Sequence, residues 1–475
     1  MDKRGVAVLA VLALQRPGAA RANDLLDAYH QAQQQDTTLQ AAAYQRDAAV
    51  EARPQALAAF LPQLDANANL VRERLAADGE SASSTPGAGA TTGSGVFYGN
   101  TGTYALTLNQ QVWSFQSFHQ LAEANLQAAQ AQAAYSSAEQ GLILRVAQAY
   151  FGVLSAADTL RINQLERGAY GELLRQAQKR VENGLSPQTD VKEAQSFFDI
   201  SAEGVIDAES ALDDAQRALA QLTAGEPRAV KQLREQIPLA LPQPALPEAW
   251  VGSALQDNYD LRAADLQAQA AQRDISVNRS RALPTLSLQG SLSKYDYDPQ
   301  IGSDQRVNAV GVVLDWPLFQ GGRVASQVRQ ARATWEQLKA QYEGDRRAVE
   351  RQTRAAFRGV VAGAEKVRSD HQAVESNQAA VEASRLGHEL GTRNEFDLLN
   401  AQTNYYGALR SYYQSRYDYL TQMLTLKQLA GRLGENDLAA VDALLGEERT
   451  PPPPGAASAL SAELSADTAA APDTK

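Results

Sequence analysis

The chain has 475 residues, with 44 Lys and Arg against 55 Asp and Glu, which gives a formal net charge of −11. This charge argues against a nucleic-acid-binding scaffold, which needs a basic face. The absence of cysteine excludes disulfides, thiolate metal sites, cysteine nucleophiles and a lipid-modified N-terminal cysteine.

Residues 1–22 have the pattern of a secretory signal peptide. Lys3 and Arg4 supply positive charge, residues 5–14 form an apolar run, and residues 20–22 fit a cleavage site with small residues. An ordinary buried helix is the alternative. No later stretch reaches the roughly 18 consecutive apolar residues that a transmembrane helix needs.

Residues 23–230 contain helical patterns interrupted by two strand patterns. After a first helical segment, residues 61–75 and 103–113 alternate apolar and polar side chains with period two, as strands do. Residues 118–183 and 186–222 then predict two long helices. At about 1.5 Å per residue the first of these approaches 100 Å, a length that favours side-by-side helical packing over a globular domain.

The second half of the chain repeats this order. Residues 231–247 are proline-rich and predict a linker, and residues 248–446 again give a helix, two strands and two long helices. The strands are expected over 283–297 and 307–316, and the long helices over 322–390 and 393–433. Repetition of the whole unit indicates an internal duplication. Residues 447–475 are rich in Pro, Ala, Ser and Asp and predict a disordered tail.

The turn between the two long helices has a similar sequence in each half. Residues 183–195 read NGLSPQTDVKEAQ and residues 390–402 read LGTRNEFDLLNAQ, and the two align without a gap. Gly184 and Gly391 stand where a residue in the left-handed conformation ends a helix. Both stretches therefore predict a tight reversal from one helix into the next.

The same stretches suggest how the next helix begins. In the first turn we expect Ser186 to cap the helix, with Pro187 at the first helical position. In the second turn we expect Thr392 to be the cap, with Glu395 three residues later completing a capping box.

Four strands are too few to close a barrel, and lipid does not tolerate an open sheet edge. If these strands enter a membrane, several chains must share one barrel: two copies give eight strands and three give twelve. Trp113, Trp316 and Tyr104 are then candidate interfacial aromatics. The alternative is a soluble sheet with half-buried strands, which shows the same alternation.

The combination resembles the TolC family of outer-membrane channel-tunnels, from residue 23 to about residue 445. The resemblance is carried by GTRNEFDLLNAQ at 391–402, TDVKEAQ at 189–195 and PLFQGGRVASQVRQA at 317–331. It implies an α+β membrane protein that forms a homotrimer. Each chain would give four strands to a shared 12-stranded β-barrel, and its long antiparallel helices would form part of a trimeric α-barrel across the periplasm.

The resemblance also implies a gate at the periplasmic helix turns. Thr189, Asp190, His388 and Arg393 match positions of polar links, in which Arg393 and His388 would both pair with Asp190. From the residues alone, Asp190 is better explained as a carboxylate that favours the start of a helix, and it is the resemblance that favours a link. His388 is either a pH-responsive link or an exposed histidine without a role.

Two further positions match a constriction ring in the family. Asp397 would contribute one carboxylate per chain, and Asn400 stands where the family has a second aspartate. The ring is therefore expected to bind cations less tightly, because three carboxylates around an axis attract cations and this chain has one fewer per copy. Asp397, like Asp190, also fits a simple role at a helix start.

The implied function is a passive exit duct that spans the outer membrane and the periplasm, for type I protein secretion, drug efflux or both. The implied partners are outer-membrane lipid, a periplasmic membrane-fusion adaptor and an inner-membrane ABC or other export pump. We expect no catalytic residues, no metal and no cofactor, because the four histidines are scattered and no nucleotide-binding loop or serine elbow is present. A soluble periplasmic coiled-coil adaptor or scaffold is the alternative.

Overall fold

The computed structural model describes residues 24–77, 95–225, 230–298 and 303–446. The predicted signal peptide and tail lie outside these ranges, as does most of the loop between the first two strands. The helices are α1 (Leu25–Gln35), α2 (Thr37–Val50), α3 (Ala52–Ala58), α4 (Phe115–Glu182), α5 (Gln188–Thr223), α6 (Pro247–Asp257), α7 (Tyr259–Ser280), α8 (Arg323–Glu389), α9 (Glu395–Leu429) and α10 (Glu435–Asp442). The strands are β1 (Gln63–Ala77), β2 (Gly95–Trp113), β3 (Thr285–Tyr297) and β4 (Gln305–Asp315).

The chain divides into two compact units, and each takes residues from both predicted halves. The helical unit comprises residues 1–40, 138–258 and 350–475. The sheet-bearing unit comprises residues 41–137 and 259–349. The long helices α4 and α8 contribute their first parts to the sheet-bearing unit and their second parts to the helical unit.

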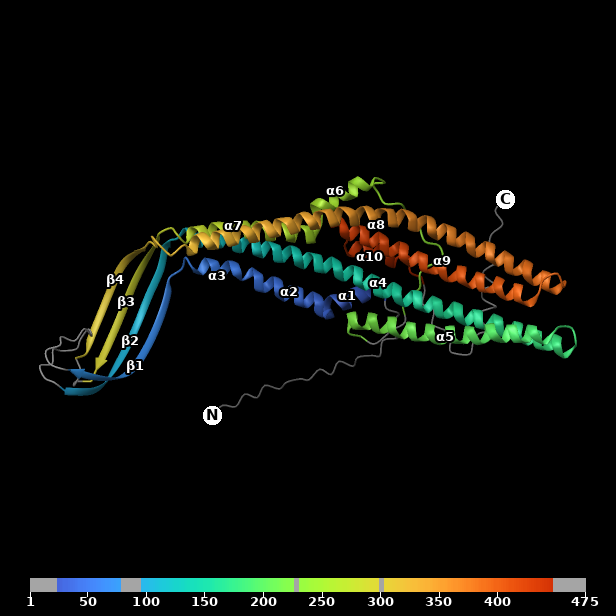
Figure 1. The fold of residues 1–475 in the computed structure, drawn as a ribbon, viewed down its shortest axis with the longest axis horizontal. Coiled ribbons are helices and arrows are strands. Elements are labelled where there is room, and N and C mark those ends of the chain that lie inside the picture. The colour runs from blue at the N-terminus through green and yellow to red at the C-terminus, as the bar shows by residue number, and fades with distance from the viewer. Residues whose placement is uncertain (1–23, 78–94, 226–229, 299–302, 447–475) are drawn as a thin grey trace, which may run out of the picture. The chain divides into compact units, whose positions relative to one another are not determined.

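The four strands form one antiparallel sheet in the order β1-β2-β3-β4 (Figure 1). β1 and β4 are the edge strands, and β2 begins earlier than the predicted strand at 103. The side chains of Val310, Val312 and Leu314 lie on one face of β4 and are 81%, 67% and 64% exposed. Within the described residues, the two open edges and the exposed apolar face of this sheet are surface of the kind that lipid or another chain covers.

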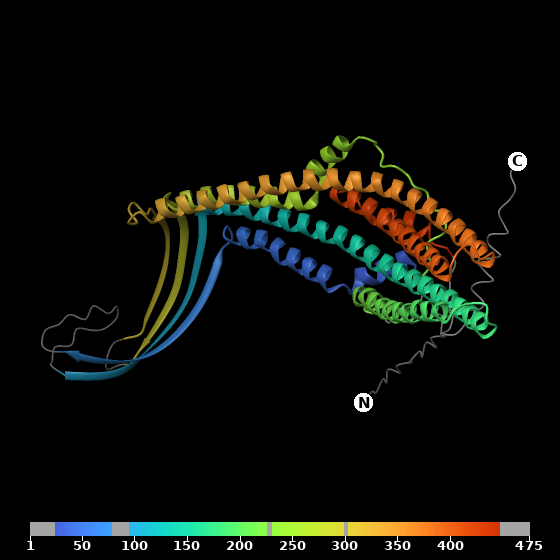
Figure 2. The same cartoon turned by 45° about the vertical axis from the view of Figure 1, so that its right-hand side comes forward.

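In the helical unit, α5, α9 and the second parts of α4 and α8 run side by side (Figure 1 and Figure 2). Apolar side chains of three of these helices meet in one cluster, in which Tyr170, Leu173, Leu398 and Leu399 are buried and Phe197 and Phe198 of α5 pack against them. At about 1.5 Å per residue, the 68 residues of α4 extend over roughly 100 Å, as the sequence predicts.

Described parts of the predicted linker are held against the helical unit by hydrogen bonds. Leu233 forms an antiparallel bridge with Leu445. The Tyr419 hydroxyl donates to the Ala240 carbonyl at 2.7 Å. Arg416, which is 1% exposed, donates to the Arg234 carbonyl. These contacts satisfy backbone groups of a segment that has little regular structure of its own.

The helix predicted over 393–433 ends earlier, at Leu429, because Gly431 adopts a φ of +67°. The Gly431 N–H donates to Gln428 O at 2.9 Å and the Arg432 N–H donates to Lys427 O at 2.9 Å. This pair of bonds is the Schellman motif, which requires a left-handed residue that glycine adopts without steric cost. The chain then begins the separate helix α10.

Gly431→Ala is expected to destabilise the protein by at least about 3 kcal/mol, in the upper tail of single substitutions. An added Cβ would lie 2.1 Å from the Asp257 carbonyl oxygen, in addition to the strain of the positive φ. Gly391→Ala is the matched control, because its φ is +73° and no atom lies within 4 Å of the added Cβ. It should cost about 1–2 kcal/mol. Urea midpoints of the helical circular dichroism measure both; equal losses would contradict the role of the close contact.

Candidate functional site

The two turns between the long helices close with the same hydrogen-bond pattern. In the first, Gly184 has a φ of +71° and the Leu185 N–H donates to Arg180 O at 2.8 Å. In the second, Gly391 has a φ of +73° and the Thr392 N–H donates to Gly387 O at 2.8 Å. Both are Schellman closures, so the two glycines end α4 and α8 in the same way.

The expected cap of α5 is wrong. Pro187 itself occupies the N-cap position with extended backbone, α5 begins at Gln188, and no side chain caps it. The Ser186 hydroxyl oxygen is buried and has no hydrogen-bond partner in the structure. The difference arises because Pro187 itself adopts an extended ψ of 157°, so it is not the first helical residue and Ser186 lies one position too early to cap the helix.

The expected cap of α9 is also wrong, by two residues. Asn394 is the N-cap, and the Asp397 N–H donates to Asn394 Oδ1 at 2.8 Å while the Asn394 N–H donates to Asp397 Oδ2 at 3.3 Å. The Thr392 hydroxyl instead donates to the Gly387 carbonyl at 3.0 Å. Thr392 is still part of the closure of α8, so the chain needs two more residues before a new helix can start.

Because α9 begins two residues later than expected, Glu395 lies inside the protein, where it contacts side chains from two other helices. Its Oε2 lies 3.0 Å from His388 Nε2 of α8, and the Glu395 and His388 side chains are only 3% and 12% exposed. Arg180 of α4 contacts the same imidazole nitrogen. A proton on Nε2 allows donation to Glu395, and a bare Nε2 accepts from Arg180. We call these three residues the tip cluster.

Burial raises the pKa of the Glu395 carboxyl above its ordinary value of 4.5. His388 and Arg180 act in the opposite direction, because positive charge favours the carboxylate, while Asp190 and Glu193 of α5 raise the pKa further. Residues of all four long helices therefore influence the pKa of the Glu395 carboxyl. Sequence reasoning missed it, since a glutamate in a first helical turn equally fits an exposed cap.

The predicted links to Asp190 are not contacts within one chain. Arg393 donates to the buried Ser384 hydroxyl at 2.7 Å, and His388 belongs to the tip cluster. Within the described residues, the hydrogen bond that Asp190 makes with a side chain is from Thr189, at 3.4 Å. Pairing of Asp190 with Arg393 or His388 stays a prediction for contacts between copies of the chain.

The two predicted ring positions lie on the first turns of α9. Asp397 is exposed and forms the capping box with Asn394. The Asn400 amide donates to the Phe396 carbonyl at 2.9 Å. Both residues thus have local structural roles, and a role in a ring stays a prediction.

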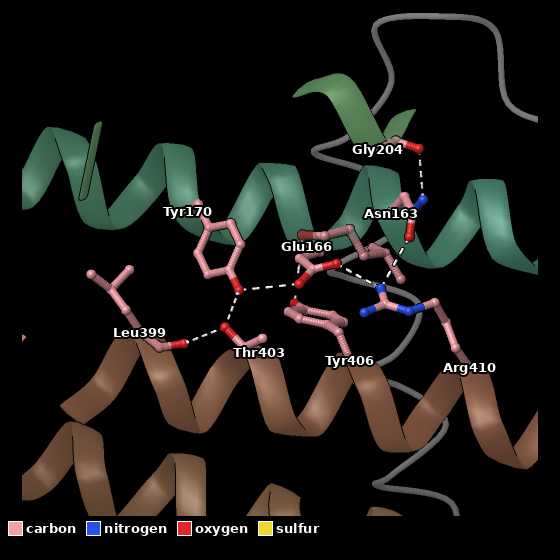
Figure 3. Close-up of polar contacts among 9 residues, drawn as sticks. Asn163, Glu166, Tyr170, Gly204, Leu399, Thr403, Tyr406 and Arg410 are labelled. Carbon is pink, nitrogen blue, oxygen red and sulfur yellow. Dashed lines mark hydrogen bonds and ion pairs between the residues drawn. The ribbon is translucent and has the colours of Figure 1, made fainter. Parts of the chain in front are cut away.

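A polar network joins α4, α5 and α9 next to the apolar cluster (Figure 3). Arg410 donates to Glu166 Oε2 at 2.7 Å and to Asn163 Oδ1 at 3.0 Å, and Asn163 donates to the Gly204 carbonyl at 2.7 Å. The Tyr170 hydroxyl donates to Glu166 Oε1 at 3.1 Å. The Glu166 side chain is 12% exposed, so these partners replace most of the water that an exposed carboxyl would contact.

The described part of the chain contains no group of three or more His, Asp or Glu that could hold a metal ion. The described helices include none with the length and apolar character needed to cross a membrane. The arrangement at the turns is suited to holding helix ends together by polar contacts.

Long paired helices with Schellman turns, together with a four-stranded antiparallel sheet, are the fold of an outer-membrane channel subunit. Solved structures show this. The Campylobacter jejuni CmeC outer membrane channel has a TM-score of 0.73 at 17% identity, over 89% of this chain and 90% of that one. The Vibrio cholerae outer membrane protein VceC has a TM-score of 0.73 at 19% identity, over 86% of this chain and 96% of that one.

The chain belongs to the outer membrane efflux protein family, whose model matches residues 28–225 and 250–432. It is 32% identical to the outer membrane protein TolC of Vibrio cholerae, over 90% of this chain and 94% of that protein. It is 30% identical to the alkaline protease secretion protein AprF of Pseudomonas aeruginosa, over 90% of this chain and 88% of that protein. The protein is therefore an outer-membrane duct for efflux or secretion that extends into the periplasm.

Proposed function

We propose that three copies of the chain enclose one water-filled duct, with their sheets joined into a 12-stranded barrel in the outer membrane. The observation that carries this proposal is the sheet with open edges at β1 and β4 and an exposed apolar face. A single sheet of this kind is not stable in lipid, whereas twelve strands leave no edge and enclose a pore.

We infer that the duct is a passive conduit without catalytic activity. Its cargo is protein, small molecules or both: AprF is by name a secretion protein, and the family model that the chain matches is by name one of efflux proteins. A passive conduit needs an energy source elsewhere, so we propose that a periplasmic adaptor and an inner-membrane ABC or other export pump recruit it.

We further propose that the duct is gated at the periplasmic helix turns. Thr189, Asp190, His388 and Arg393 would supply polar links there, and Asp397 and Asn400 would face the axis. A link between at least partly exposed side chains, such as Asp190 and Arg393, contributes about 0–1 kcal/mol. Weak links are suited to a gate that a partner must open.

Arg393→Ser is expected to raise the mean conductance of single channels in planar bilayers. The substitution removes the contact with Ser384 and any contact with Asp190 of a neighbouring copy. Loss of one such contact in each of three chains amounts to up to about 3 kcal/mol, or roughly 100-fold in the ratio of open to closed tips. Arg175→Ser, which removes an exposed pair with Glu172 on α4, is the control and should leave the conductance unchanged.

One result would contradict the proposed duct, and a different result would contradict the proposed gate. Wild-type protein that inserts but conducts no ions would contradict the duct. Wild-type channels with the same conductance as Arg393→Ser channels would contradict the gate at Arg393 and leave the duct in place.

A further inference from the structure

One end of the sheet is surrounded by exposed apolar side chains. The register pairs Trp113 with Leu286 and Thr285 with Asp315, so β1 and β3 begin where β2 and β4 end. Leu318 and Phe319, which follow β4, are 79% and 88% exposed. Other exposed side chains at this end are Leu61, Trp113, Phe115, Leu283 and Trp316. Aromatic and apolar side chains in such a ring mark the level at which a membrane meets water.

The segments next to this ring carry arginine but no acidic residue. Residues 52–64, 110–122, 275–293 and 316–335 contain no Asp or Glu. The acids that directly flank these segments are Asp65 and Asp315 on the strands and Glu51, Glu123, Asp274 and Glu336 on the helical side. The arginines of these segments are all exposed, and within the described residues none forms an ion pair. We call this set the arginine band: Arg53, Arg279, Arg281, Arg323, Arg329 and Arg332.

Some arginines further along α8 have acidic partners on the same helix. Arg346 pairs with Glu343, and Arg354 and Arg368 pair with Glu350 and Glu365. The other arginines in that part of α8 resemble the band, since they form no ion pair within the described residues. What distinguishes the band is its place next to the apolar ring, where its positive charge would face an anionic surface.

The distance from the sheet divides the arginines of the band into two groups. Arg323 begins α8, and Arg329 and Arg332 follow at about 9 and 14 Å along the helix axis. A headgroup layer is about 5–8 Å thick on each side of the hydrocarbon. Arg323, and Arg281 just before β3, are therefore placed to contact phosphates directly. The other arginines attract the anionic membrane surface electrostatically without contact. Such attraction extends over about one Debye length, which is about 8 Å at physiological salt.

We propose that the arginine band binds the headgroup phosphates of anionic phospholipids in the leaflet on the helix side of the membrane. The guanidinium group presents paired N–H donors to phosphate oxygens. The apolar ring places Arg281 and Arg323 at the depth of those phosphates, and the other arginines of the band add attraction at longer range. This inference rests on the proposed membrane position of the sheet.

The test uses the tryptophans of the full-length protein, two of which, Trp113 and Trp316, lie in the apolar ring. The protein is reconstituted into phosphatidylcholine vesicles that contain a minor fraction of brominated lipid, either phosphatidylglycerol or phosphatidylcholine. The ratio of the two quenching strengths measures the preference for the anionic lipid. The variants are Arg281→Gln/Arg323→Gln and, as a control that removes the same charge about 35 Å further along α8, Arg346→Gln/Arg347→Gln.

Wild-type protein and the control are expected to prefer phosphatidylglycerol, and Arg281→Gln/Arg323→Gln to lose at least about tenfold of that preference. A basic residue near an anionic surface contributes about fivefold. Salt at 1 M should reduce the wild-type preference, which keeps the proposal testable if the double variant does not insert.

Equal quenching by both lipids in wild-type protein would overturn the proposal. Equal losses of the preference in the two variants would also overturn it, because they would indicate a general charge effect. Absence of quenching by either lipid would instead contradict the membrane position of the sheet.

Discussion

Arg410→Met is expected to lower the free energy of unfolding of the helical unit by about 3–5 kcal/mol, the cost of leaving a buried charge without its partner. Glu166 loses the 2.7 Å contact with Arg410 and keeps only Tyr170, while its side chain remains 12% exposed. The Asn163 side-chain oxygen loses the hydrogen bond that Arg410 donates to it at the same time. The urea midpoint and slope of the far-UV circular dichroism measure the effect.

Two comparisons make this expectation specific to the buried network. Arg175→Met removes an ion pair with Glu172 on the same helix, but those side chains are 68% and 50% exposed, so the cost should be at most about 1 kcal/mol. Arg410→Met/Glu166→Met removes both charges and should recover part of the lost stability. If Arg410→Met and Arg175→Met cost the same, the network does not stabilise the α4–α9 contact as argued.

Acidification is expected to close the tip, and Glu395→Gln is expected to abolish that response. The tip cluster buries Glu395 and raises its pKa. We propose that this arrangement is the closed tip, so that an open tip that hydrates the carboxyl returns the pKa toward its ordinary value of 4.5. The closed state therefore binds the proton more tightly. Its extra stability is fully present below about pH 4.5 and is lost as the pH rises through the raised pKa.

Single-channel conductance between pH 4.5 and 7.5 measures this response. Within the window, each pH unit changes the ratio of closed to open tips by up to about tenfold per chain. Glu395→Gln is neutral throughout, so its conductance should stay at the level that acid produces in the wild type. Glu382→Gln, which alters an exposed glutamate on α8, is the control and should keep the wild-type pH dependence. A Glu395→Gln channel with the full wild-type dependence would assign the response to another group.

Much of the fold is predictable because its patterns are local. Period-two alternation marks the four strands, and the long segments rich in Ala, Gln and Glu mark the helices. Gly184 and Gly391 predict the turns, since few other residues accept a φ near +70°.

The site is less predictable, because its contacts join residues far apart in the sequence. Arg410 and Glu166 are 244 positions apart, and neither differs in sequence context from the exposed charges around it. The caps were misplaced for a local reason: the Schellman closure uses Thr392, and a proline occupies the N-cap of α5. That displacement of two residues is what turns Glu395 from an expected capping residue into a buried partner of His388.

The stoichiometry of the detergent-solubilised protein tests the shared duct most directly. Light scattering with the detergent contribution subtracted should give three times the mass of one chain, which is 51.1 kDa before the signal peptide is removed, and removal of detergent should precipitate the protein. A single chain that remains in solution without detergent would contradict the account, because one four-stranded sheet would then need neither lipid nor neighbours to cover it.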